Sequence, residues 1–383
     1  MALSLNLLLP LLQATESLRA LCAALERGDA ARASVIDAAK PALVAALHQA
    51  CGRPTLLVTA RPARARQLYE ELRVWLPPTA ELHLFPTAEA FPYERLPLDA
   101  ETAALRRGVL ARLAGVPLTE AAAPGTLLVV TSVRGLLDRL LAPAVLRQRA
   151  VEVRLGARLR LDRLLDALVA LGYRRVSLVE NPGEFARRGG IVDVFPATLP
   201  APDALLPTPD GRDGAAGGAP VALRIEFFGD EIESLRWFDP TTQRSHTDAT
   251  ACLLTPVHEV LPPLAPEAAA ALAALELHPL REELATKLAR EREQLLAGQA
   301  FPWLDEYRAY LGTSSLLDYL PAEGLLLLDE PASLAETART LVQQAAEVQA
   351  DLVRRGEAPA GLWPALFSWE DIEARLASGP WRR

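Results

Sequence analysis

The pattern of hydrophobic and polar positions in the first 146 residues alternates between short apolar runs and amphipathic stretches. The apolar runs predict buried strands at 55–59, 81–85 and 126–131. Amphipathic stretches with a helical period separate them and predict helices at 11–27, 41–51, 63–75, 100–113 and 133–140, with a further short strand at 33–36. Apolar strands that alternate with helices are typical of a parallel sheet covered on both faces. We therefore expect an α/β domain over residues 1–146.

A period of two replaces this pattern in residues 147–248, most clearly at 191–195 and 221–226. Gly229-Asp230 predicts a tight hairpin turn before a return strand at 232–238. One face of the predicted antiparallel sheet is apolar, and the other carries arginine and glutamate. Further strands at 150–154 and 173–179 and a helix at 162–171 complete a predicted α+β domain. Residues 200–220 are rich in Pro, Gly and Ala without periodicity, which predicts a flexible insert.

The α/β pattern resumes in residues 249–383. A strand is expected at 252–254 and an apolar strand at 324–328. The expected helices are at 333–355 and 368–376, and most of 266–299 is expected to be helical. The chain is thus predicted to leave a parallel-sheet domain, form an α+β domain, and return to the first sheet.

Composition narrows the class of protein. A chain of 383 residues is expected to hold two or three domains. The formal net charge of −8 argues against general nucleic-acid coating. Three scattered cysteines suit a reducing cytoplasm and indicate neither a disulfide framework nor a metal site. No apolar run is long enough to span a bilayer, so a cytoplasmic protein without a membrane partner is expected.

The segment Asp37-Ala38-Ala39-Lys40 stands where a nucleotide-binding P-loop would stand, between a predicted strand and a helix. A P-loop needs glycines so that successive backbone N–H groups surround phosphate, followed by Lys and Ser or Thr. This segment has no glycine, Pro41 removes one N–H group, and Asp37 would repel phosphate. The segment is interpreted as a degenerate P-loop that binds no ATP.

Asp329 and Glu330 close an apolar strand, as a Mg²⁺-binding acidic pair does in an NTPase. Acidic residues at the start of a helix are also favoured by the helix dipole alone. Without a phosphate loop, the second explanation is preferred. These features together resemble an NTPase sheet that has lost its chemistry, and we predict no catalytic residue, cofactor or metal in this chain.

An arginine-rich stretch is the best functional candidate. Residues 147–188 hold ten arginines against five acidic residues, which inverts the overall balance. Guanidinium groups form bidentate pairs with carboxylates at protein interfaces. A solvated basic face, inflated by the arginine-rich composition of the chain, remains an equal alternative. A nucleic-acid surface is less favoured because Glu226, Glu231 and Glu233 lie in the same predicted sheet.

Three segments carry a resemblance to a known family: GEFARRGGIVDVFP with RIEFFGDEIESLRWFDPTTQRS, HLFPTAEAFPYERLPLD, and LLDYLPAEGLLLLDEP. The first resembles the UvrB-homology module of bacterial transcription-repair coupling factors, and the other two resemble the opening and closing parts of the same module. The resemblance implies a domain 1a at 1–146, a domain 2 at 147–248 and a domain 1b at 249–383, with 1a and 1b forming one unit.

The resemblance also implies a function. Domain 2 in this family binds UvrA, the damage-recognition subunit of nucleotide excision repair, and recruits it to stalled RNA polymerase. The implied UvrA-binding residues are Arg174, Arg175, Arg188, Phe195, Arg224 and Glu226. UvrB carries another arginine where this chain has Ala186, so the contact set departs from that of UvrB. The family lacks a working P-loop in this module, in agreement with the degenerate segment at Lys40.

Full-length coupling factors also contain an RNA-polymerase-interacting domain and a DNA translocase driven by ATP and Mg²⁺, and this chain stops before both. The leading hypothesis is a monomeric, non-catalytic module that recruits UvrA. The alternatives are a UvrB-like subunit that binds ATP and DNA through Lys40, Asp329 and Glu330, and a general DNA-binding fragment.

Overall fold

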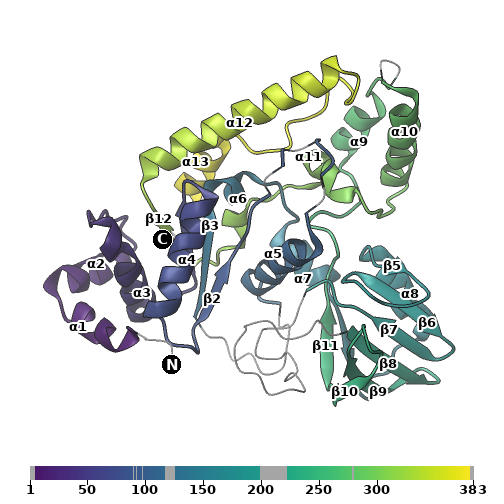
Figure 1. Ribbon diagram of the computed structural model, residues 1–383, viewed down its shortest axis with the longest axis horizontal. Helices are drawn as coiled ribbons and strands as arrows, with labels where there is room; N and C mark the ends of the chain where they lie inside the picture. The colour runs from purple at the N-terminus through teal and green to yellow at the C-terminus, as the bar shows by residue number, and fades with distance from the viewer. Residues whose placement is uncertain are drawn as a thin grey trace.

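The computed structural model describes residues 5–88, 90–91, 93–96, 98–116, 126–198, 222–277 and 280–379. Two β-sheet units and a peripheral helical region make up this part of the chain (Figure 1). The first unit is a four-stranded parallel sheet, whose strands in spatial order are β12 (Leu325–Leu328), β1 (Thr55–Thr59), β3 (Leu127–Ser132) and β2 (Glu81–Leu84). Because β12 pairs directly with β1, the last part of the chain returns to the first sheet, as the sequence pattern predicts.

Helices cover both faces of this sheet. Leu57, Leu128 and Val130 pack on the side of α3 (Lys40–Cys51) and α4 (Pro62–Trp75). Alternate residues, including Leu56 and Val129, contribute to the core on the opposite side. The helices of that core are α5 (Ala100–Leu113), α6 (Val133–Leu137), α12 (Pro331–Arg354) and α13 (Trp369–Ser378). The prediction of a parallel sheet buried on both faces is confirmed.

The N-terminal region differs from its prediction. Instead of one helix, η1 (Asn6–Leu8), α1 (Leu9–Gln13) and α2 (Glu16–Glu26) precede the sheet. The predicted strand at 33–36 is wrong: these residues are exposed and irregular, and Ile36 has no core to pack against. The degenerate P-loop therefore follows an irregular segment, with Asp37–Ala39 forming the 3-10 turn η2.

The second unit is a six-stranded sheet in which only the pairing of β5 with β6 is parallel. Its strands in spatial order are β10 (Ser245–Asp248), β9 (Glu231–Phe238), β8 (Ala222–Phe228), β7 (Ile191–Val194), β6 (Glu184–Arg188) and β5 (Arg174–Arg175). Helix α8 (Leu161–Ala170) packs Leu164 and Leu168 against one face. The two-residue turn at Gly229-Asp230 is confirmed. The predicted strand at 173–179 is reduced to β5. The Val176 N–H still donates a hydrogen bond of 2.9 Å to the carbonyl oxygen of Phe185, but beyond it the segment leaves the sheet edge, and Val179 packs with Phe195 and Ala186.

The boundary of the second unit lies later than predicted. Strand β11 (Ala251–Leu254), placed by the sequence in the third segment, pairs antiparallel with β4 (Val151–Arg154). The α+β unit therefore extends beyond residue 248. The predicted flexible insert at 200–220, and Val221 at the predicted start of β8, lie outside the described residues.

Shorter elements connect these units. The predicted helical region at 266–299 forms α9 (Pro266–Ala273) and α10 (Glu282–Leu296). The remaining elements are α7 (Pro143–Arg149), η4 (Leu304–Tyr307), α11 (Arg308–Leu311) and η5 (Leu316–Tyr319). In the part of the chain that the structure describes, no single helix has the length and apolar character to cross a membrane. The helices Asn6–Gln13 and Glu16–Glu26 reach that length and apolar character only when taken together, and the chain bends by 81° between them.

Candidate partner-binding face and the site of the degenerate P-loop

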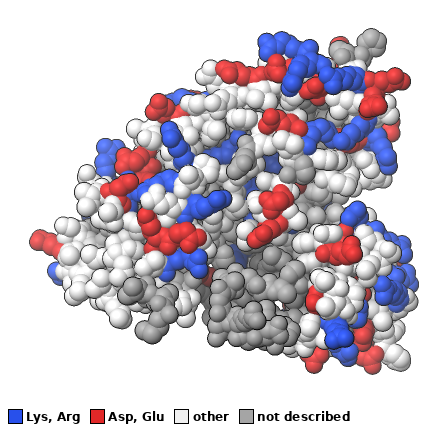
Figure 2. Space-filling model, viewed as in Figure 1, with Lys and Arg blue, Asp and Glu red and all other residues white. Residues whose placement is uncertain are grey.

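One face of the six-stranded sheet carries most of the predicted contact residues. Val192, Leu223 and Ile225 point toward α8, so the residues that alternate with them lie on the other face. We call this second surface the open face. Cross-strand pairing and alternation place on it Arg174, Arg188, Ile191, Asp193, Arg224, Glu226, Ser234 and Arg236. Basic side chains gather along the outer rim of this lobe (Figure 2).

The structure separates the two arginines of β5. Arg174 lies on the open face and forms an ion pair with Glu184, yet its side chain is 66% exposed. Arg175 pairs with Phe185 across the strands, which places it on the side of α8, and it is also exposed. The pKa of Glu184 is lowered: burial acts to raise it, but the backbone N–H groups of Glu180 and Asn181, together with Arg174, outweigh that effect. Of this pair, only Arg174 shares a surface with the other candidates.

Arg188 is an exposed cation on the open face. It ends β6 immediately before the Gly189-Gly190 turn, and its Nη2 donates a long hydrogen bond of 3.4 Å to the carbonyl oxygen of Ser177. Within the described residues it forms no ion pair. Gly189 adopts a φ of +62°, which a residue with a Cβ rarely adopts, so the turn depends on glycine. The guanidinium of Arg188 therefore remains free to pair with a carboxylate from outside.

Arg224 is largely committed to an internal partner. Its Nε and Nη2 donate hydrogen bonds of 2.7 and 2.9 Å to the carboxylate of Asp193 on the adjacent strand, and the side chain is only 20% exposed. The hydrogen bonds with Asp193 are the main reason that the pKa of Arg224 is raised. Glu226, two residues along the same strand, is half-buried and has no ion-pair partner among the described residues. Arg224 thus organises the face, whereas Glu226 can still contact a partner.

Phe195 is not a surface residue, contrary to the prediction. Its side chain is 1% exposed and packs with Val179, Ala186, Ala222 and Phe238. Alternation does place it on the side of the open face, but the segment that contains Val176 and Val179 covers it there. Phe195 therefore stabilises the sheet and offers almost no surface to a partner.

The segment at the degenerate P-loop lies against the acidic pair at the end of β12. Lys40 Nζ contacts Asp329 Oδ1 at 2.7 Å, Glu330 Oε1 at 2.8 Å and Asp37 Oδ1 at 2.8 Å. Arg64 approaches the carboxylates of Asp37 and Asp329 at 3.2 and 3.7 Å. The sequence therefore identified residues that the fold brings together, 289 positions apart in the case of Lys40 and Asp329.

We call Asp37, Lys40, Arg64, Asp329 and Glu330 the Lys40 cluster. Burial acts to lower the pKa of Lys40, but the three carboxylates outweigh it and raise the pKa above its ordinary value. A cavity of about 540 Å³ adjoins the cluster. The carboxylates of Asp37, Asp329 and Glu330 already pair with the ammonium group of Lys40. A phosphate group that entered the cavity would therefore have to compete with them for this lysine.

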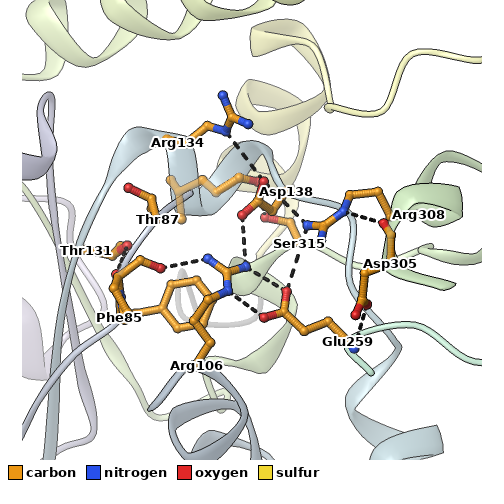
Figure 3. A network of polar contacts seen from close by, with 12 residues as sticks. Phe85, Thr87, Arg106, Thr131, Arg134, Asp138, Glu259, Asp305, Arg308 and Ser315 are labelled. Atoms are coloured by element: carbon orange, nitrogen blue, oxygen red, sulfur yellow. Dashed lines mark hydrogen bonds and ion pairs between the residues drawn. The ribbon is translucent and has the colours of Figure 1, made fainter. Parts of the chain in front are cut away.

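A buried ion-pair cluster that the sequence did not reveal connects the two sheet units (Figure 3). Arg106 on α5 is fully buried and donates hydrogen bonds of 2.5 and 2.7 Å to Glu259 and of 2.9 Å to Asp138. Its guanidinium also lies 4.2 Å from the ring centroid of Phe85. Arg308 approaches both carboxylates at 3.8 Å. We call Arg106, Asp138, Glu259 and Arg308 the Arg106 cluster.

The Arg106 cluster fixes how the chain leaves the second unit. Glu259 follows β11 closely in sequence, whereas Arg106 and Asp138 belong to the first unit. The backbone N–H of Glu259 donates a hydrogen bond of 2.9 Å to the carboxylate of Asp305. This bond connects the cluster to η4, later in the chain. The cluster therefore ties the segment that follows β11 to the first unit.

Comparison with known proteins identifies the second unit. A family model described as the UvrB interaction domain matches residues 151–202 and 215–259. The match begins at β4, ends at Glu259 of the Arg106 cluster, and includes every described strand of the six-stranded sheet.

The chain contains a UvrB interaction domain.

Proteins named transcription-repair-coupling factor match most of the chain. The relative from Bacillus subtilis (strain 168) is 28% identical over 340 residues, covering 85% of this chain and 26% of the relative. The relative from Myxococcus xanthus is 29% identical over 361 residues, which cover 89% of this chain and 27% of the relative. The relative from Mycobacterium bovis is 31% identical over 321 residues, which cover 82% of this chain and 24% of the relative. The chain matches the UvrB-homology module of this family and spans about a quarter of the length of these relatives.

The UvrB interaction domain carries all six predicted contact residues, but the structure sorts them into different roles. Arg188 and Glu226 are accessible on the open face without an internal ion-pair partner among the described residues. Arg174 is exposed but forms an ion pair with Glu184, and Arg224 is mostly buried and paired with Asp193. Arg175 lies on the other side of the sheet, and Phe195 is buried.

Proposed function

We propose that this chain recruits UvrA through the open face of its UvrB interaction domain. The observation that carries the proposal is Arg188, an exposed guanidinium at the end of a strand inside the matched domain, which has no carboxylate partner among the residues that the structure describes. Such a group forms bidentate, charge-assisted hydrogen bonds with a carboxylate on a partner. The names of the relatives support a role in transcription-coupled nucleotide excision repair.

The module acts by binding and performs no catalysis in this proposal. The Lys40 cluster supports this part, because its lysine is held by three carboxylates in the place where a P-loop lysine would hold phosphate. In the relatives, RNA polymerase and DNA would be bound, and ATP and Mg²⁺ used, by regions that this chain does not span. The likeness to coupling factors supports this division of roles, and a cytoplasmic, monomeric module is the form that we propose.

A pull-down with purified UvrA tests the proposal. Arg188→Glu reverses the charge of the accessible guanidinium and is expected to abolish retention of UvrA. Arg163→Glu is the matched control, because Arg163 is exposed on α8, which covers the other face of the sheet. Circular dichroism should show the same melting temperature for both variants, since both side chains are exposed. Equal retention of UvrA by the wild type and Arg188→Glu would remove the interface assignment.

Nucleotide binding is the second candidate, and the cavity of about 540 Å³ beside Lys40 is the observation that favours it. The cavity is lined by Arg61 and Arg64 as well as by acidic side chains. Equilibrium binding of labelled ATP with Mg²⁺ separates the candidates: micromolar affinity that Lys40→Ala abolishes would support a UvrB-like, ATP-binding module.

A further inference from the structure

An exposed aromatic side chain stands at the tip of the open face. Phe228 is the last residue of β8 and is 76% exposed, although phenylalanine is normally buried in a folded domain. It directly precedes the Gly229-Asp230 turn. No ring contact or cation–π contact involves Phe228 among the described residues.

The register of the hairpin places Phe228 on the open face. The pairing of β8 with β9 shifts between Glu226 and Phe227, after which Phe227 pairs with Ile232 and Phe228 with Glu231. Phe227 and Ile232 both pack in the core under α8. Because successive residues of a strand point to opposite faces, Phe228 lies on the face away from α8. It therefore shares a surface with Arg188 and Glu226.

The backbone fixes Phe228 beside the turn that carries Arg188. The N–H group of Phe227 donates a hydrogen bond of 2.9 Å to the carbonyl oxygen of Gly190. A Cβ atom at Gly190 would lie 3.1 Å from the carbonyl oxygen of Phe227, so glycine permits this close approach of the two hairpins. Ile191, which follows, is half-buried on the open face and pairs with both Arg188 and Glu226. The open face thus carries an aliphatic side chain one strand away from Glu226 and an exposed aromatic ring two residues further along β8.

Charges of opposite sign flank this apolar tip. Arg188 lies on the β6 side, whereas Glu226, Asp230 and Glu231 lie on the β8–β9 side. None of these four residues forms an ion pair with another described residue. An apolar anchor surrounded by charged side chains is the usual anatomy of a binding hot spot with a polar rim.

We propose that Phe228 is the apolar anchor of the UvrA contact, an inference that rests on the proposed function. The complementary surface on UvrA is an apolar pocket with a carboxylate on the side that meets Arg188 and a cationic side chain on the side that meets Glu226 and Glu231. The ring supplies buried area, and the two charged flanks fix the orientation of docking. Phe228 takes the role of aromatic contact that the buried Phe195 cannot fill.

Equilibrium titration of purified UvrA against the whole chain tests this anchor. Phe228→Ala is expected to weaken binding by about tenfold or more, as truncation of an anchoring aromatic does. Val169→Ala is the matched control, because Val169 is 59% exposed on α8, on the other side of the sheet, and its removal should leave affinity unchanged. Phe228→Leu keeps an apolar side chain without the ring and provides a second variant if the alanine variant does not fold.

The outcomes separate this inference from the function on which it rests. If the wild type binds UvrA and both Phe228 variants bind equally well, the anchor is refuted while recruitment of UvrA stands. If the wild type itself does not bind UvrA, both proposals fail. Weaker binding by the Phe228 variants, with Val169→Ala equal to the wild type, supports the anchor.

Discussion

Replacing Lys40 with methionine tests whether the Lys40 cluster stabilises the fold or binds phosphate. The substitution keeps an apolar side chain of similar length and removes the charge that three carboxylates share. Asp329 has a side chain that is 10% exposed, and its remaining ion-pair partner among the described residues would be Arg64, at 3.7 Å. The cluster joins the start of α3 to the end of β12, so its loss loosens the return of the chain to the first sheet.

The three contacts of Lys40 should contribute unequally to stability. The contact with the nearly buried Asp329 is a charge-assisted hydrogen bond, which contributes about 1.5–3 kcal/mol. Asp37 and Glu330 are mostly exposed, so solvent screening makes their ion pairs with Lys40 much weaker than the contact with Asp329. Lys40→Met is therefore expected to lower the free energy of unfolding by about 2–3 kcal/mol, whereas Glu330→Gln should lower it by less than about 1 kcal/mol.

Thermal unfolding followed by circular dichroism provides the assay. For a unit of this size, a loss of 2–3 kcal/mol corresponds to a fall of about 5–10 °C in melting temperature. Glu330→Gln is the matched control within the same cluster. Equal melting temperatures for the wild type and Lys40→Met would refute a structural role for the cluster. Tight ATP binding by the wild type that Lys40→Met abolishes would show that the lysine is available to phosphate after all.

Two further predictions concern the Arg106 cluster. Arg106→Met leaves two buried carboxylates without their main partner, so the free energy of unfolding should fall by about 3–5 kcal/mol in chemical denaturation, and a loss below 1 kcal/mol would contradict the structural role. Burial acts to raise the pKa of Asp138, but Arg106, Arg308 and Arg134 outweigh it and lower the pKa. Asp138 thus contributes stability that is complete above its unfolded pKa of about 3.9 and is lost as the pH falls through the lower folded value. The melting temperatures of the wild type and Asp138→Asn should therefore differ most near pH 7 and converge below about pH 4; a constant difference would refute this reasoning.

Elements with strong local signals were predictable from sequence. The apolar run at 55–59 matches β1, and α5 begins at the expected residue because the Asp99 side chain caps it, accepting a 2.8 Å hydrogen bond from the N–H of Thr102. Gly229-Asp230 identified the hairpin turn. The prediction at 33–36 failed because a short strand needs a neighbouring strand, and these exposed residues pair with none in the part of the chain that the structure describes.

Site residues depend on tertiary contacts that local patterns do not contain. Arg106 lies in an ordinary amphipathic helix, and its partners Asp138 and Glu259 are 32 and 153 residues away, so nothing near it signals an ion-pair cluster. The resemblance placed Phe195 among the contact residues, but it could not reveal that the side chain is buried against Val179 and Ala186. The signal for Phe228 was present: an aromatic residue directly before a two-residue turn extends beyond the neighbouring strand.

Hydrogen-exchange mass spectrometry of the chain with and without UvrA tests the central claim most directly, because it maps the contact without any substitution. The account predicts that UvrA slows exchange in peptides from 184–194 and 222–238, which form the open face and its tip. Peptides from 37–59 and 325–354, around the Lys40 cluster, should exchange at the same rate in both samples. Protection confined to the Lys40 cluster, with the sheet unchanged, would contradict the account.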